Sequence, residues 1–140
     1  MSKALIAAVI SVFLVSCANQ QMYEGPKQTP DKIAQIKPGT PSLLSFDPEV
    51  LIEEIDGVPP RNKVTVDTPI YEVLPGHHRV KVRLRNLSAP YVRPLPSRSI
   101  EFNASAGETY IVFYRWRNRG ESDWILFVKD DRTGKVVAER

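Results

Sequence analysis

Residues 78–85 alternate between apolar and basic side chains, and this alternation restricts the fold more than any other feature of the chain. One set of alternate positions is apolar (Val80, Val82, Leu84) and the other is basic (Arg79, Lys81, Arg83, Arg85). Successive side chains of a β-strand point to opposite faces of the sheet. The segment therefore predicts a strand whose apolar face covers a core and whose basic face meets solvent.

Much of the chain after residue 46 repeats this period of two between turn residues, which indicates β-structure. The expected strands are residues 50–55, 70–74, 78–85, 99–104, 108–116, 123–129 and 135–138, with a short edge piece at residues 64–66. Residues 110–114 are apolar at every position, which predicts a central strand covered on both faces. Twelve prolines also favour loops and sheet edges over long helices. About seven short strands predict an all-β fold, either a small β-sandwich or an open barrel.

The N-terminal segment has the layout of an export signal. Lys3 supplies one positive charge, and Ala4–Val15 is a nearly continuous apolar segment of 12 residues interrupted by Ser11. A helix needs about 20 apolar residues to span a bilayer, so the segment is too short for a membrane-spanning anchor. A removable signal peptide over residues 1–16 is the better interpretation.

The apolar segment ends at Leu14-Val15-Ser16-Cys17, which contains the only cysteine of the chain. This sequence resembles the bacterial lipobox, with a leucine three residues before the cysteine and a small residue directly before it. The resemblance implies that Cys17 carries a diacylglyceryl group and becomes the acylated N-terminus. Several acyl chains provide stable membrane attachment where one is marginal. In proteobacterial lipoproteins an Asp after the cysteine favours the inner membrane, so Ala18 implies the outer membrane, with the domain facing the periplasm.

Residues 17–45 are expected to form a flexible, proline-rich linker after the lipidated cysteine. Repeated Pro, Gly and Gln without a sustained apolar period are typical of linkers, and such a segment could hold a domain tens of ångströms from a bilayer at about 3 Å per residue. Within it, residues 31–37 predict one or two helical turns capped by Asp31 and ended by Pro38. The folded domain is accordingly placed at residues 46–140.

Three turns and the strands that they begin carry a second resemblance. They are Ile55-Asp56-Gly57, Pro75-Gly76-His77-His78, and Ala106-Gly107-Glu108 leading into the longest strand. Over roughly residues 51–137 the chain is similar to small PEGA-like bacterial envelope lipoproteins. This resemblance implies a transthyretin-like or immunoglobulin-like sandwich with a role in envelope adhesion or assembly. It carries over no catalytic residues.

The sequence offers weak candidates for chemistry. Adjacent His77 and His78 have no third histidine or mature-domain cysteine to complete a usual zinc set, so a place in a turn is expected. The consecutive acids at residues 53–54 and 130–131 should diverge along strands and be solvated. No Gly-x-Ser-x-Gly nucleophile motif occurs. We therefore expect no enzyme activity, no cofactor and no metal site.

A cluster of cations is the best candidate for binding a partner. No acidic residue occurs between Val73 and Ile100, a stretch that contains six basic candidates: Arg79, Lys81, Arg83, Arg85, Arg93 and Arg98. Arginine suits bidentate contacts with phosphate or carboxylate, so an anionic envelope polymer or an acidic protein could bind there. The alternative is that these charges only solvate the sheet and block edge pairing. The aromatic residues Tyr110, Phe113, Tyr114, Trp116 and Trp124 are expected in the core rather than in a binding groove.

The overall charge of the chain is small. Loss of residues 1–16 removes Lys3 and lowers the formal charge from +3 to +2, which predicts no obligatory nucleic-acid role. The expected partner is the membrane, through Cys17, together with an envelope protein or anionic polymer. The expected function is a non-enzymatic structural or assembly role, with an anion-binding module as the alternative. The sequence leaves the oligomeric state open.

Overall fold

The computed structural model describes residues 19–39, 48–61, 69–85, 95–118 and 123–140. These residues form nine β-strands and one short 3-10 helix, η1 (Pro30–Lys32), and no α-helix occurs among them. The strands are β1 (Asn19–Gln21), β2 (Ala34–Pro38), β3 (Glu49–Ile55), β4 (Ile70–Val73), β5 (Gly76–Arg85), β6 (Arg98–Ala104), β7 (Thr109–Trp116), β8 (Trp124–Asp130) and β9 (Val136–Glu139). The protein is a small all-β sandwich, as predicted, and β3 to β9 match the seven expected strands. The predictions for residues 1–16, Cys17, residues 64–66 and Arg93 lie outside the described residues.

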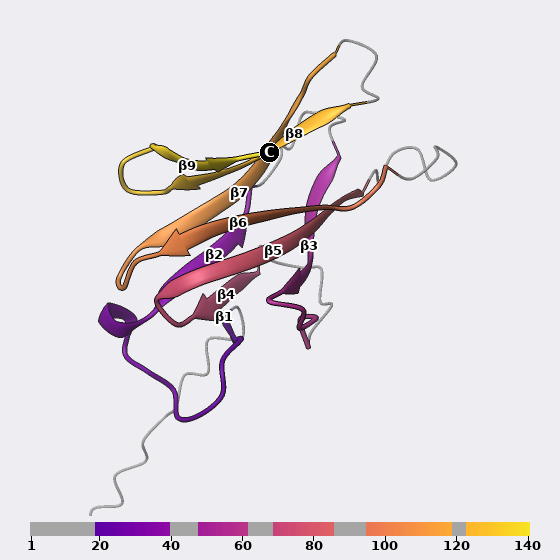
Figure 1. Cartoon of the computed structure of the whole chain (residues 1–140). Coiled ribbons are helices and arrows are strands. Elements are labelled where there is room, and N and C mark those ends of the chain that lie inside the picture. Colours follow the sequence, from indigo (N-terminus) through magenta and orange to yellow (C-terminus); the bar gives the residue numbers. More distant parts are fainter. Residues whose placement is uncertain (1–18, 40–47, 62–68, 86–94, 119–122) are drawn as a thin grey trace, which may run out of the picture.

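Two sheets make up the sandwich (Figure 1). The larger sheet has the order β1-β4-β2-β7-β8-β9, and the smaller sheet has the order β3-β5-β6. The larger sheet is mixed, because β1 runs parallel to β4 and β2 runs parallel to β7. Strand β6 packs against β8 and β9, while β3 packs against β2 and β7. The smaller sheet therefore covers the larger one from a single side.

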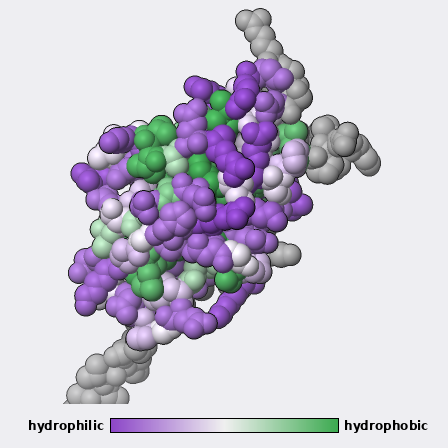
Figure 2. Space-filling model, viewed as in Figure 1, coloured by the Kyte–Doolittle hydropathy of each residue, from purple (hydrophilic) through white to green (hydrophobic). Residues whose placement is uncertain are grey.

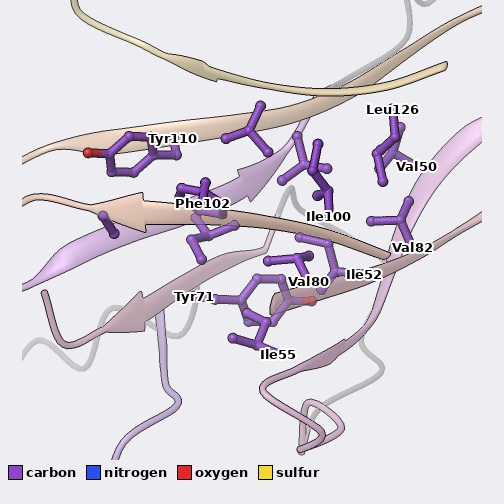
Figure 3. Close-up of a cluster of buried hydrophobic side chains, with 14 of the residues drawn as sticks. Val50, Ile52, Ile55, Tyr71, Val80, Val82, Ile100, Phe102, Tyr110 and Leu126 are labelled. Atoms are coloured by element: carbon purple, nitrogen blue, oxygen red, sulfur yellow. The ribbon is translucent and has the colours of Figure 1, made fainter. Parts of the chain in front are cut away.

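The core lies between the two sheets (Figure 3). The alternating residues Val80, Val82 and Leu84 of β5 are 0–5% exposed, and they face the apolar side of the larger sheet. From that side, Val112, Leu126 and Val128 are fully buried. The alternation that predicted β5 thus identifies its buried face correctly.

The predicted linker is wrong for residues 19–39, which are part of the fold. Strand β2 is a central strand of the larger sheet, antiparallel to β4 and parallel to β7. Its residues Ala34 and Ile36 are fully buried, because their side chains enter the core at alternate positions. The prolines that suggested a linker flank this strand, and Pro38 is its last residue. The folded domain begins at Asn19 at the latest, rather than at residue 46.

The predicted helical turns at residues 31–37 are also wrong. Only the single 3-10 turn η1 forms, and its N-cap residue is Thr29, without a side-chain capping bond. The chain becomes extended at Ile33, and β2 follows directly. Residues 34–38 form a strand rather than a helix because a strand here makes hydrogen bonds to neighbours on both sides and buries one face.

Candidate functional site

The basic face of β5 was the leading candidate, and its cations are arranged as the alternation predicts. We use "β5 face" for Arg79, Lys81, Arg83 and Arg85, which alternate with the buried residues of that strand. Among the described residues, the neighbouring strand β3 supplies a carboxylate for three of these four cations. Lys81 Nζ lies 3.7 Å from Glu54 Oε1, Arg83 Nε lies 3.1 Å from Glu53 Oε1, and Arg85 Nε donates to Glu49 Oε2 at 3.0 Å.

A β-bulge in β3 explains how two consecutive acids reach two cations of the same strand. The pairing register between β3 and β5 shifts between Ile52 and Glu54, which leaves Glu53 as the extra residue. A bulge disturbs the strict alternation of side chains. The expectation that Glu53 and Glu54 diverge into solvent is therefore wrong. The β5 face is a ladder of ion pairs rather than a field of free positive charge.

The remaining predicted cations do not complete an anion site. Arg79 has no ion pair among the described residues, although Glu101 is its cross-strand partner on β6. Arg98 instead reaches β8, where it donates to the Trp124 carbonyl at 2.6 Å and to Asp123 Oδ1 at 2.7 Å, and its guanidinium lies 5.0 Å from the Trp124 ring centroid. The structure thus separates Arg98 from the β5 face. In the view of Figure 2, hydrophilic residues cover most of the surface, and the apolar patches are separate from one another.

Asp123, the residue directly before β8, is surrounded by groups that favour its ionised form. Partial burial opposes its ionisation, but a hydrogen bond from Arg98, the Trp124 backbone N–H and the charges of Arg117 and Arg98 outweigh it. Together these partners lower the pKa of Asp123 below its usual value. Asp123 therefore links the turn before β8 to β6 through a charged contact.

His77 and His78 lie within β5 and not in a turn, so the turn expectation is wrong. His78 extends the buried face of the strand and is 9% exposed, whereas His77 points outward. The Nε2 atom of His78 lies 2.6 Å from the Leu74 carbonyl oxygen, and Nδ1 lies 2.6 Å from Asp56 Oδ2. A carbonyl oxygen only accepts, so the contact with Leu74 places a hydrogen on Nε2. Both ring nitrogens of His78 are therefore engaged, and the side chain joins the Asp56-Gly57 turn to the segment after β4.

Asp56 has a left-handed backbone conformation, which Asp adopts more readily than most residues other than Gly. It has φ 53°, and with Gly57 at φ 79° it forms a two-residue hairpin turn closed by mutual backbone bonds between Ile55 and Val58. Its carboxylate also accepts from the Arg79 backbone N–H at 2.8 Å. The sequence correctly predicts a turn at Asp56-Gly57.

Among the described residues, no group of three or more His, Cys, Asp or Glu side chains is placed to hold a metal ion.

A second surface was missed by the sequence analysis. Strands β7 and β8 turn Tyr110, Val112, Leu126 and Val128 into the core, and the alternate residues point to the other side of the larger sheet. We call this side the outer face, formed by Ile111, Phe113, Arg115, Ile125, Phe127 and Lys129. Phe113 and Phe127 stack with their centroids 5.1 Å apart. The expectation that β7 is covered on both faces fails here, since the smaller sheet lies on one side only.

The two cations of the outer face sit over its aromatic rings. Arg115 lies 5.2 Å from the Phe127 centroid, and Lys129 lies 5.2 Å from the Phe113 centroid. These are cation–π contacts, which leave the positive charge uncompensated by a carboxylate. Phe113 therefore belongs to the outer face rather than the core, while Tyr110 and Trp124 are buried in the core as expected. The signal for this surface was available in the alternate apolar positions 111, 113, 125 and 127.

Among the described residues, no helix is long and apolar enough to cross a membrane. No protein-family model, no curated protein and no solved structure matches this chain.

Proposed function

We propose that this protein is a lipid-anchored envelope protein with a non-enzymatic structural or assembly role. The observation that carries the proposal is the Leu14-Val15-Ser16-Cys17 sequence at the end of an apolar segment of 12 residues. Its resemblance to a lipobox supports acylation of Cys17, and Ala18 supports an outer-membrane location facing the periplasm. The resemblance to PEGA-like envelope domains supports the same class of role.

The position of β1 changes what such an anchor would do. Asn19 is the first residue of β1 and is two residues after Cys17. Two residues span at most about 7 Å between their Cα atoms. The proposed anchor therefore holds the larger sheet directly at the bilayer, instead of releasing a domain on a long linker.

A non-enzymatic role is supported by the contacts that the histidine and the acidic side chains make within the fold. His78 is held on both sides of its ring by Asp56 and Leu74. The acids of β3 are engaged with the cations of β5. These contacts stabilise the sandwich and its loops, which is what a structural module requires.

The second candidate, an anion-binding module at the β5 face, has less support. An anion would have to displace Glu49, Glu53 and Glu54 from their ion pairs, and these carboxylates would repel it. Arg79 remains as the one cation of the β5 face without a carboxylate partner among the described residues.

The test is metabolic labelling with an alkyne fatty acid, followed by separation of membrane and soluble fractions. Cys17→Ser should abolish both the label and the membrane fraction, because the serine hydroxyl does not replace the thiol in lipoprotein acylation. Ser16→Ala is the matched control, since it keeps a small residue before the cysteine, and it should retain both. Unchanged label and partitioning in Cys17→Ser would refute the proposal.

A further inference from the structure

The two exposed sides of the sandwich differ in how their cations are compensated. On the β5 face, three of four cations lie beside a carboxylate of β3. On the outer face, Arg115 and Lys129 make cation–π contacts, and neither makes an ion pair with a described residue. Glu139 of β9 is the cross-strand partner of Phe127, but it pairs with neither cation. On the same side of the sheet, Lys37 is compensated by Asp131 at 3.0 Å. Arg115 and Lys129 therefore lack a carboxylate partner among the described residues, as Arg79 does on the β5 face.

The outer face also carries large apolar side chains, and the smaller sheet packs on the opposite side of β7 and β8. Ile111, Phe113 and Ile125 are partly exposed, and Arg115 is exposed. Phe127 is 6% exposed although it lies outside the core cluster, and the Phe113 ring stacks against it. Aromatic and aliphatic groups next to Arg and Lys are suited to the boundary between headgroups and acyl chains.

The lipid attachment point lies at the edge of this same sheet. Strand β1 is an edge strand of the larger sheet, and Asn19 donates from its side chain to Glu72 Oε1 at 3.1 Å. Glu72 alternates with the core residues Tyr71 and Val73, so this contact lies on the outer side of the sheet. Two strands, β4 and β2, lie between β1 and β7, so three spacings of about 4.8 Å separate them. An anchor at Cys17 and the outer face can therefore reach one flat surface together.

We propose that the outer face of the larger sheet lies against an anionic phospholipid surface, with Arg115 and Lys129 contacting headgroups. This inference rests on the proposed lipid attachment at Cys17. Two cations bind a membrane weakly, but the attachment keeps them at a high effective concentration next to the bilayer. Each cation near an anionic leaflet favours this orientation by about fivefold. The β5 face then points away from the membrane.

The experiment compares two lysines of one protein as probes of the two faces. The chain from Cys17 onward contains every described residue, and its only thiol can be coupled to a maleimide phospholipid in vesicles. Acetylation of Lys129 and Lys81 by an N-hydroxysuccinimide ester is then followed by mass spectrometry. On vesicles that contain phosphatidylglycerol as the anionic lipid, the Lys129 to Lys81 rate ratio should fall about fivefold relative to the uncoupled protein.

Two variants with equal charge change locate the effect. Arg115→Gln should restore much of the Lys129 rate on the anionic vesicles, whereas Arg83→Gln on the β5 face should leave the protection intact. An unchanged ratio, or protection of Lys81 instead of Lys129, overturns the proposal. Because the coupling is chemical, this result is independent of whether cells acylate Cys17, so the two proposals fail separately.

Discussion

His78 and Asp56 are 22 residues apart, and a contact of 2.6 Å between their side chains fastens the end of β3 to the start of β5. The same histidine ring contacts the Leu74 carbonyl in the segment that follows β4. The His78 side chain therefore holds together the turn after β3 and the segment between β4 and β5. Asp56 has a positive φ, and its carboxylate contacts both this ring and the Arg79 backbone N–H.

Replacing His78 with Ala should lower the free energy of unfolding by about 2–3 kcal/mol. The substitution removes two hydrogen bonds, one of them to a charged group, from a nearly buried site. His77→Ala is the control, and it should change stability by less than about 0.5 kcal/mol because its side chain is exposed. Urea denaturation of both variants checks the prediction. Equal effects of the two substitutions would show that the contact with Asp56 contributes nothing.

Truncating Ile36 to Ala should destabilise the domain by about 3 kcal/mol. Ile36 is fully buried in β2, and loss of such a side chain removes apolar contacts and leaves a cavity. Its neighbour Gln35 points to the other side of the sheet, so Gln35→Ala should cost less than about 1 kcal/mol. Thermal or chemical unfolding measures both. If Ile36→Ala unfolds like the wild type, residues 34–38 are a linker after all.

Asp123 should make stability depend on pH in the acid range. Its pKa is lowered in the folded protein, so its ionised form stabilises the fold above the usual aspartate pKa. This contribution is lost as the pH falls through the folded-state pKa. Asp123→Asn should therefore reduce the loss of stability between about pH 5 and pH 2. Glu24→Gln, at an exposed position, should leave that dependence unchanged. Denaturant titrations at several pH values distinguish the two variants.

The bulge in β3 should give the Glu53–Arg83 pair a small but measurable coupling energy. A double-mutant cycle with Glu53→Gln and Arg83→Gln should yield about 0.5 kcal/mol, because the pair is partly exposed. The Glu54–Lys81 pair, with its longer separation of 3.7 Å, is the matched comparison and should yield less. A larger value for Glu54–Lys81 would contradict the ranking by distance. High salt should reduce both couplings.

Sequence periodicity predicts the strands well because burial on one face imposes a period of two. Residues Val80, Val82 and Leu84 identify both the existence of β5 and its buried side. The Asp56-Gly57 turn is predictable for a similar local reason, since both residues tolerate positive φ. These features depend on neighbours in the sequence.

The errors arise where distant segments decide the outcome. Strand β2 is short and flanked by prolines, and it becomes a strand because β4 and β7 pair with it on its two sides. The β5 face looked like free positive charge because its carboxylate partners are on β3, about 30 residues earlier in the chain. The sequences of β7 and β8 do not show that the smaller sheet covers only one side of these strands. The outer face was therefore not predicted.

The parallel pairing of β2 with β7 has a consequence for the order in which the chain can fold. Gln35 and Thr109 bond across the sheet, 74 residues apart. During synthesis from the N-terminus, β2 lacks its β7 partner until the residues of β7, up to Trp116, have been made. Such non-local pairing makes folding slow. One edge of β2 therefore stays open while most of the chain is synthesised, and the proline at the end of this strand limits wrong pairing during that interval.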